Sequence, residues 1–392
     1  MADRPLRIGV AGLGRGFMLM LPTFLADRRV ALVAAADPRA EARARFAADF
    51  GGRAYDDVEA LCRDDQIEAV YVATPHEYHA RHAIAAAEAG KHVLVEKPMA
   101  LDLDECRAMI DAARAARVRL IVGHSHSYDA PVARTRALIA SGAYGRLRLI
   151  TALNFTDFVY RPRRPEELDP SAGGGVVLSQ ASHHVDIARL LAGGRARSVR
   201  AQTGDWDARR PTEGAYAAFI DFGDGVAATL SYSGYDRFDS DELVGWIGET
   251  GLPKDPGRHG AARRRLGQVA DAAAEAALKA ARGFGGAASA SATGPRHHEH
   301  FGFLLASCEN ADLRPMADRV VIYADERREE LLPAPAVPRV EVIDELYEAV
   351  VHGRPPVHSG EWAMATLEVC LAIRRSAAEQ RDILLEHQVA LP

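Results

Sequence analysis

The chain is predicted to be an α/β protein with two domains: an N-terminal doubly wound parallel sheet, and a C-terminal α/β domain with an open, mainly antiparallel sheet. Strand-length apolar runs alternate with helical stretches over about the first 125 residues, which predicts the parallel sheet. Beyond residue 144 the apolar pattern changes to a period of two, and Gly223-Asp224-Gly225 separates two such runs as a hairpin turn would. The expected domains are 1–125 and 126–392, with an insertion at about 251–295.

Composition limits the classes of partner. The chain has 392 residues, of which 48% are hydrophobic, so it can form two sizeable cores. Its 48 basic and 54 acidic residues give a net charge of -6 without a long block of one sign, which predicts a small-molecule substrate and neither nucleic acid nor membrane as partner. We expect a cytoplasmic protein, because we find no signal region or bilayer-length apolar run and no CxxC pair among Cys62, Cys106, Cys308 and Cys370.

The first strand, Leu6 to Ala11, runs into a glycine-rich turn before a helix predicted from Met18 to Asp27. In this context the first glycine permits a tight turn, the second lets a diphosphate approach, and the helix N-terminus supplies amide groups. A phenylalanine stands where the third glycine of the usual pattern would be, so the motif is weak by itself. The residues expected to bind a dinucleotide here are Gly12, Gly14, Arg15, Gly16 and Phe17.

The second strand, Val30 to Ala36, ends at Asp37, which follows Gly14 by 23 residues. An acid at this spacing binds the adenosine ribose hydroxyls and favours NAD, because it would repel a 2′-phosphate. Arg39 could accept that phosphate, so NADP stays open. Asp37 could also be a helix N-cap before the next helix.

Each later strand of the first domain also ends in polar residues. The strand Ile67 to Ala73 leads to Thr74-Pro75 and His79, and the strand Leu120 to Gly123 leads to His124-Ser125-His126. The carboxyl ends of parallel strands meet at one edge of a sheet, so these residues should line one crevice. Helices are predicted for Ala40 to Phe50, for the stretch through Ala89, and for Asp102 to Ala116.

The strand that begins at His92 delivers Glu96 and Lys97 to the same crevice. A lysine there can lie beside a cofactor, and burial or a neighbouring cation can depress its pKa enough for proton exchange near neutral pH. The alternative is a surface Glu-Lys pair that closes an ordinary strand.

In the second domain, a glycine triplet at 173–175 precedes a helix that carries His183, His184 and Asp186, of which His183 and Asp186 share a face. The insertion is predicted to hold an alanine-rich helix and a mobile loop from Gly283 to Gly294. The C-terminal helices can pack back on the N-terminal domain. The strands expected are Leu147 to Phe158, Ser198 to Thr203, Ala215 to Phe222, Val226 to Tyr232, Glu242 to Ile247 and Val320 to Tyr323, and the helices Glu341 to Val351 and Glu361 to Gln380.

Three patterns in this order resemble those of the Gfo/Idh/MocA oxidoreductases, the family of glucose-fructose oxidoreductase and inositol dehydrogenase. They are the glycine turn, Thr74-Pro75 with His79 before the string GKHVLVEKP at 90–98, and the glycine triplet ahead of His183 and Asp186. The resemblance implies a Rossmann domain, NAD or NADP as cofactor, and a C-terminal sheet that forms a homodimer or homotetramer. It also implies that Lys97 touches nicotinamide and substrate, that His183 shuttles the substrate proton, and that Glu96, Thr74, Pro75, His79 and Ser125 lie at the cofactor.

Two positions depart from the sugar and polyol dehydrogenases of this family. Ser179 stands where an aspartate is usual, four residues before His183, and Ser125 stands where an asparagine is frequent. The strings at 179–183, 160–164 and 307–309 are similar to those of the phthalate 4,5-cis-dihydrodiol dehydrogenase branch. This resemblance implies hydride transfer from a carbinol of a small cyclic substrate, such as an aromatic cis-dihydrodiol, with an inositol or sugar as the alternative. The residues expected at the substrate are His126, Arg161, Arg163, Ser179, His184 and Asp186.

Other interpretations remain for some residues. Arg161, Arg163 or Arg164 could bind an aromatic carboxylate, or they could belong to a solvated loop. Residue types that bind metal in a metal-dependent hydrolase occur at His124 and His126, at His183-His184 with Asp186, and in the string HHEH at 297–300. That reading gives the glycine turn and Lys97 no role, so no metal is predicted. A non-catalytic dinucleotide-binding protein would keep the crevice, but the presence of both Lys97 and His183 argues against it.

Overall fold

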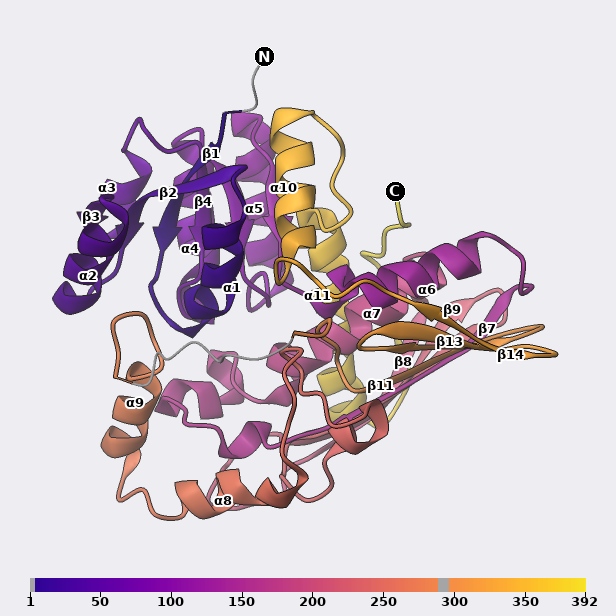
Figure 1. Ribbon diagram of the computed structural model, residues 1–392. Helices are drawn as coiled ribbons and strands as arrows, with labels where there is room; N and C mark the ends of the chain where they lie inside the picture. Colours follow the sequence, from indigo (N-terminus) through magenta and orange to yellow (C-terminus); the bar gives the residue numbers. More distant parts are fainter. Residues whose placement is uncertain (1–3, 288–295) are drawn as a thin grey trace.

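The computed structural model describes residues 4–287 and 296–392 and contains two packed α/β units (Figure 1). The first unit is a six-stranded parallel sheet in the order β3-β2-β1-β4-β5-β6, which is the order of a doubly wound dinucleotide-binding sheet. Its strands are β1 (Leu6–Ala11), β2 (Val30–Ala36), β3 (Arg53–Tyr55), β4 (Ala69–Val72), β5 (His92–Val95) and β6 (Leu120–Val122).

The central strands are apolar and buried because helices cover both faces of this sheet. Two of the helices begin at aspartate caps, since the Asp57 carboxylate accepts from the Ala60 amide and that of Asp102 from the Glu105 amide. The short strand β3 is mostly exposed and has no apolar pattern that predicts it. The helices are α1 (Arg15–Ala26), α2 (Ala40–Phe50), α3 (Val58–Cys62), α4 (His79–Glu88) and α5 (Leu103–Ala116).

The second unit is a nine-stranded sheet in the order β14-β13-β12-β11-β7-β10-β9-β8-β15. Only the β7–β10 pair is parallel among its described pairings, so the predicted α/β fold class with an open, mainly antiparallel second sheet is confirmed. The strands are β7 (Leu147–Phe155), β8 (Ser198–Gly204), β9 (Ala215–Gly223), β10 (Val226–Ser233), β11 (Phe303–Cys308), β12 (Asp312–Met316), β13 (Arg319–Tyr323), β14 (Arg327–Leu331) and β15 (Ile383–Leu384).

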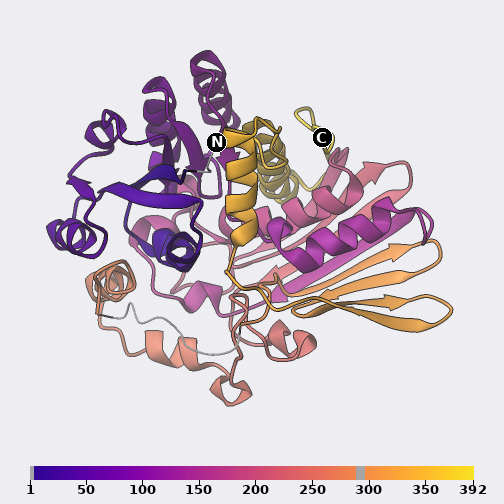
Figure 2. The same cartoon turned by 45° about the horizontal axis from the view of Figure 1, so that its top comes forward.

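Helices α6 (Ala130–Ala140), α7 (Ser182–Ala192) and α11 (Gly360–Glu379) cover one face of this sheet and leave the other face open (Figure 2). Helix α10 (Val340–Val351) returns to the first unit, where Ile343 and Leu346 join the core formed by strand β1 and helix α1. Helix α11 contacts both α5 and β8 and so packs against both units. Among the described residues, no helix is both long and apolar enough to cross a bilayer.

Two expectations for the second unit are wrong. The segment predicted as a strand from Glu242 to Ile247 contains instead a short 3-10 helix, Ser240–Val244, because the Asp239 carboxylate caps it and Gly245 ends it with a φ of 77°. The insertion holds two helices, α8 (Ala261–Leu266) and α9 (Ala272–Ala280), in place of one. Most of the loop expected from Gly283 to Gly294 lies outside the described residues.

Candidate active site

The glycine-rich turn has the shape that a diphosphate requires. Gly12 has a φ of 93°, and a Cβ there would lie 2.8 Å from the carbonyl oxygen of Ala73, so only glycine fits. A Cβ at Gly14 would meet no atom of the described residues within 4 Å, which leaves the backbone open to a ligand. Helix α1 begins at the next residue without a side-chain cap, so its first amide groups can face an anion. The turn therefore fits a dinucleotide.

The Phe17 side chain does not face the crevice, so its expected contact with the cofactor could come only from its backbone amide in the first turn of α1. Its ring is fully buried and packs on Phe46 and Phe284, with centroids 6.5 and 5.4 Å away. The large side chain at the position of the third glycine points into the core between α1 and α2. Gly16 lies beside the Glu96 side chain, whose Cγ would be 3.5 Å from a Cβ at that glycine.

Asp37 fastens the end of β2 to the glycine turn. Its Oδ2 accepts the Leu13 amide at 2.8 Å, and its Oδ1 accepts Arg39 Nε at 2.9 Å. Arg39 also donates from Nη2 to the Leu13 carbonyl at 2.8 Å. Asp37 thus neutralises the guanidinium that could otherwise attract a 2′-phosphate.

His79 links the segments that follow strands β4 and β5. Its side chain is fully buried, so it has no exposed surface for the cofactor contact that was expected. Its Nδ1 lies 2.8 Å from the carbonyl oxygen of Pro98, and its Nε2 lies 2.8 Å from that of Thr74. Because both ring nitrogens are engaged, His79 fixes the geometry of the edge from behind. Thr74 and Pro75 remain half-buried at this edge, directly after β4.

Lys97 lies at the end of β5, between the two units. Its Nζ donates to the carbonyl oxygen of Ser179 at 2.6 Å. Burial lowers the pKa of Lys97 to about 8, opposed by the carboxylates of Glu96 and Glu249. Glu96 Oε1 accepts the Tyr71 hydroxyl at 2.5 Å, and burial raises the pKa of Glu96. The lysine can therefore lose a proton near neutral pH.

His183 comes to the same place from helix α7. Burial lowers the pKa of His183 well below its usual value, and the positive charge of Lys97 lowers it further, so the two side chains are electrostatic neighbours. Its Nδ1 accepts the backbone amide of His126 at 3.4 Å. The rings of His126 and Phe301 flank it, each with its centroid 4.7 Å away. The structure thus brings an amine and an imidazole from separate units to one site.

Residues that could ligate a metal gather after β6. The ligand atoms of His124, His126, Asp129 and Glu299 lie within 4.8 Å of one another. Asp129 accepts from His124 Nε2 at 3.2 Å and from His126 Nδ1 at 2.7 Å, while Arg339 Nη2 lies 3.0 Å from Glu299 Oε2. The four ligand groups therefore already have protein partners. As arranged here, they hold the His126 backbone against His183.

Three expected substrate contacts are structural in this geometry. The Ser179 hydroxyl donates to the Gly175 carbonyl within its own helical turn, so Ser179 reaches the site through its carbonyl oxygen. His184 is buried and its Nδ1 lies 2.7 Å from the Tyr216 hydroxyl oxygen. Asp186 is buried and accepts Trp362 Nε1 at 2.5 Å, which ties α7 to α11.

The arginines of the 160–164 loop are already paired to different degrees. Arg161 donates to the carboxylates of Asp157 at 2.7 Å and Glu249 at 3.1 Å, which leaves it poorly placed for the substrate contact expected of it. Arg163 stacks 3.7 Å over the Phe158 ring, and its nearest carboxylate is 3.7 Å away, so it is the more available guanidinium.

Several residues at the site had no sequence signal. Glu249 and Arg339 lie on irregular segments far along the chain, yet their charges act directly on Lys97. His76 follows Pro75, and burial together with Lys97 lowers its pKa well below the usual value. A polar residue after a strand end could have suggested His76, whereas no spacing rule leads to the other two.

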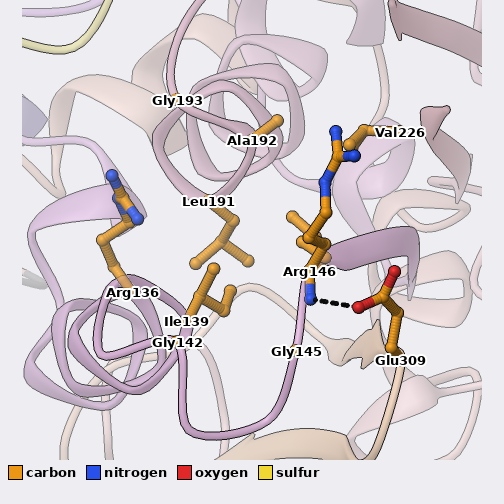
Figure 3. A pocket seen from close by; sticks show the side chains of 11 residues that line it. Arg136, Ile139, Gly142, Gly145, Arg146, Leu191, Ala192, Gly193, Val226 and Glu309 are labelled. Atoms are coloured by element: carbon orange, nitrogen blue, oxygen red, sulfur yellow. Dashed lines mark hydrogen bonds between the residues drawn. The ribbon is translucent and has the colours of Figure 1, made fainter. Parts of the chain in front are cut away.

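Two hollows differ in what lines them. A cavity of about 30 Å³ lies under Lys97 and is bordered by Ser125, Ser182 and His358, which is space for about one water molecule. A larger hollow of about 400 Å³ opens between the ends of α6 and α7, beside Arg146 and Glu309 (Figure 3). None of the predicted site residues borders the larger one.

Family models match nearly all of the first unit and the first part of the second. The model described as oxidoreductase family, NAD-binding Rossmann fold matches residues 6–124, and that of the GFO/IDH/MocA C-terminal domain matches residues 132–251. The chain belongs to the Gfo/Idh/MocA oxidoreductase family. It is an NAD(P)-dependent oxidoreductase, and its first sheet is an NAD-binding Rossmann domain, as the sequence predicts.

Relatives within the family share nearly the whole length. The chain is 51% identical over 94% of both chains to 1-carboxy-3-chloro-3,4-dihydroxycyclohexa-1,5-diene dehydrogenase of Comamonas testosteroni. A solved Bordetella bronchiseptica structure, described as a dehydrogenase, has a TM-score of 0.92 and 41% identity, covering 97% of this chain and 100% of that one. A Bordetella pertussis dehydrogenase solved with NADH and UDP-GlcNAcA has a TM-score of 0.72 at 22% identity over 98% and 99% of the chains, and so shares the fold.

Proposed function

We propose that the protein is an NAD-dependent dehydrogenase that oxidises a carboxylated cis-dihydrodiol of a six-membered ring. The observation that carries this proposal is the meeting of Lys97 and His183, from separate units, at the edge of the NAD-binding sheet. The Comamonas testosteroni relative supports the substrate class, because its name describes a carboxylated, chlorinated dihydroxycyclohexadiene. Serine at position 179, where sugar dehydrogenases of the family have an acid, also favours a less polar ring than a sugar.

Lys97 is the proposed base. A group with a pKa of about 8 is neutral in a useful fraction of molecules at physiological pH, and in that form its Nζ can accept the carbinol proton. Its bond to the Ser179 carbonyl orients the amine. Bound NAD supplies the hydride acceptor.

His183 is the proposed hydrogen-bond donor to the same carbinol oxygen. Because Nδ1 accepts the His126 amide, the neutral ring carries its proton on Nε2. The depressed pKa of His183 keeps the ring neutral, so Nε2 donates and does not take up the substrate proton. This assignment differs from the proton shuttle that the family resemblance implied for this histidine.

The substrate class adds a driving force. Oxidation of one carbinol of a cis-dihydrodiol gives a hydroxy ketone that tautomerises to an aromatic catechol, which draws the reaction forward. We assign the substrate carboxylate to Arg163 and Arg164, whose nearest carboxylates lie 3.7 and 3.5 Å away, so neither is held in a close ion pair. Arg161, by contrast, serves its two carboxylate partners.

The proposed cofactor is NAD in preference to NADP. Asp37 stands at the end of β2 and would repel a 2′-phosphate, and Arg39 is already paired with it at 2.9 Å.

We also propose a homodimer or homotetramer that forms through the open face of the second sheet. Leu149 of β7 and Phe219 of β9 are 39% and 48% exposed on that face. Large apolar side chains exposed on a sheet face are typical of a protein–protein interface. The four free cysteines support the proposed cytoplasmic location.

A substrate panel tests the proposal. The purified protein is mixed with NAD and, in turn, with a carboxylated cis-dihydrodiol, the same dihydrodiol without the carboxylate, myo-inositol and glucose, and NADH is followed by its absorbance. We expect turnover with the carboxylated dihydrodiol, accompanied by one catechol per NADH, and weaker turnover without the carboxylate. Faster turnover of inositol or glucose would assign the protein to the sugar dehydrogenases of the family instead.

A further inference from the structure

We propose that Arg282, from the insertion, binds the diphosphate of the dinucleotide together with Arg15 of the glycine turn. The insertion would then be part of the cofactor site and not a surface addition. This inference rests on NAD binding by the Rossmann domain and is independent of which carbinol is oxidised.

The insertion is docked on the glycine turn next to Arg282. The backbone amide of Phe284 donates to the Leu13 carbonyl at 3.0 Å, and its ring is buried against Phe17 at 5.4 Å and Phe50 at 6.0 Å. A Cβ at Gly283 would lie 3.0 Å from Arg39 Nη1 and 3.3 Å from the Leu13 oxygen, so the backbone passes directly over the turn. These contacts place the residue before Gly283 at the mouth of the cofactor crevice.

Helix α9, which precedes Arg282, is held to the substrate unit near both of its ends. Glu275 of α9 pairs with Arg210 at 2.8 Å and accepts the Arg163 amide at 2.7 Å. Lys279 of α9 forms an ion pair with Glu167. The segment therefore spans the crevice with both ends fixed, which holds Arg282 in place before a ligand arrives.

The charges of Arg15 and Arg282 act on the same region, and neither guanidinium is held in an ion pair among the described residues. Within residues 4–287 and 296–392, no hydrogen bond or ion pair is found for either guanidinium, and the acid that acts on Arg282, Asp157, is itself paired with Arg161 at 2.7 Å. Burial and the charge of Arg282 together lower the pKa of Arg15 to about 10. The residues 288–295 have the sequence ASASATGP and contribute no acid. Two neighbouring guanidiniums that are not held in ion pairs of their own can bind an anion.

The diphosphate is the anion that fits this position best. Arg15 is the first residue of α1, and the open backbone at Gly14 and the amides of that first turn face the same space. The substrate, by contrast, must place its carbinol at Lys97 and His183, which lie at the end of β5 and the start of α7. The glycine turn and the insertion lie on either side of the part of the crevice nearest to α1, where the diphosphate of a dinucleotide is expected.

Binding measurements test the proposal without the enzymatic reaction. Affinities of the full-length protein for NAD, ADP-ribose and adenosine are measured by calorimetry for the wild type, Arg282→Gln and the control Arg258→Gln, an exposed arginine of the same insertion. We expect Arg282→Gln to weaken the binding of NAD and ADP-ribose about tenfold or more, because a charge-assisted hydrogen bond to phosphate is lost. The affinity for adenosine should stay unchanged. Arg258→Gln should match the wild type.

Equal affinity of Arg282→Gln and wild type for NAD and ADP-ribose would overturn the proposal. If that equality came with a raised KM for the carboxylated dihydrodiol, Arg282 would be a substrate residue instead. If Arg282→Gln weakened the binding of adenosine as much as that of NAD, the proposal would also be overturned. Adenosine has no diphosphate, so such a loss would mean that the variant distorts the glycine turn itself. A double variant, Arg15→Gln with Arg282→Gln, should lose the remaining salt dependence of NAD binding.

Discussion

The proposed role of Lys97 fixes the pH dependence of oxidation. A lysine with its ordinary pKa near 10.5 is neutral in about one molecule in three thousand at pH 7, whereas a pKa of about 8 makes about one in ten neutral. Lowering the pKa from 10.5 to about 8 corresponds to about 3 kcal/mol of differential stabilisation of the neutral amine, which burial supplies. The structure therefore predicts that kcat/KM for oxidation rises about tenfold per unit below pH 8 and levels off above it.

The assay is steady-state kcat/KM from pH 6 to 10, at saturating NAD, for wild type and two variants. Lys97→Met should lose at least about a hundredfold in kcat/KM, since a positioned base contributes about 10²- to 10⁴-fold, while NAD affinity stays within a factor of about three. Glu249→Gln should shift the rising part of the pH profile, the Lys97 limb, to lower pH, because the carboxylate of Glu249 raises the pKa of Lys97 and the variant lacks it. A flat profile, or a limb that survives in Lys97→Met, would refute the assignment of the base.

Three further predictions concern other parts of the account. His183→Ala should lower kcat/KM by about a hundredfold or more with the Lys97 limb retained and NAD affinity unchanged, because a hydrogen-bond donor is lost and not the base; loss of the limb would make the histidine the base. The wild type should bind NAD more tightly than NADP in a fluorescence titration, and Asp37→Ala should narrow the difference by removing the repulsion and freeing Arg39; tighter NADP binding by the wild type would assign the choice to Arg39. Leu149→Lys should lower the oligomer mass measured by light scattering, while Leu25→Lys, an exposed site on α1, should not; a monomeric wild type would contradict the interface.

The first unit follows from its sequence because each strand end there is marked by local chemistry. Lys97 follows a buried strand and precedes a proline, and His183 follows a glycine triplet, so both could be singled out before their neighbourhood was known. Phe17 shows the limit of that reasoning. A pattern with the third glycine replaced suggested a contact with the cofactor, but an aromatic side chain at that position is stabilised by burial between two helices.

The residues that set the charge at the site could not be predicted, because tertiary packing brings them there from irregular segments. Glu249 follows the segment wrongly predicted as a strand, Arg339 precedes α10, and Arg282 lies at the end of an alanine-rich helix. His184 and Asp186 show the converse error. They share a helix with His183, but their partners Tyr216 and Trp362 hold them in the core.

A crystal structure of the protein with NAD and a bound substrate or catechol product would show whether Lys97 and His183 act on one carbinol. We expect Lys97 Nζ and His183 Nε2 both to lie within about 3.2 Å of one substrate oxygen, with nicotinamide C4 against the carbon that bears this oxygen. A complex in which that oxygen is bound by other side chains, or in which only one of the two reaches it, would contradict the account.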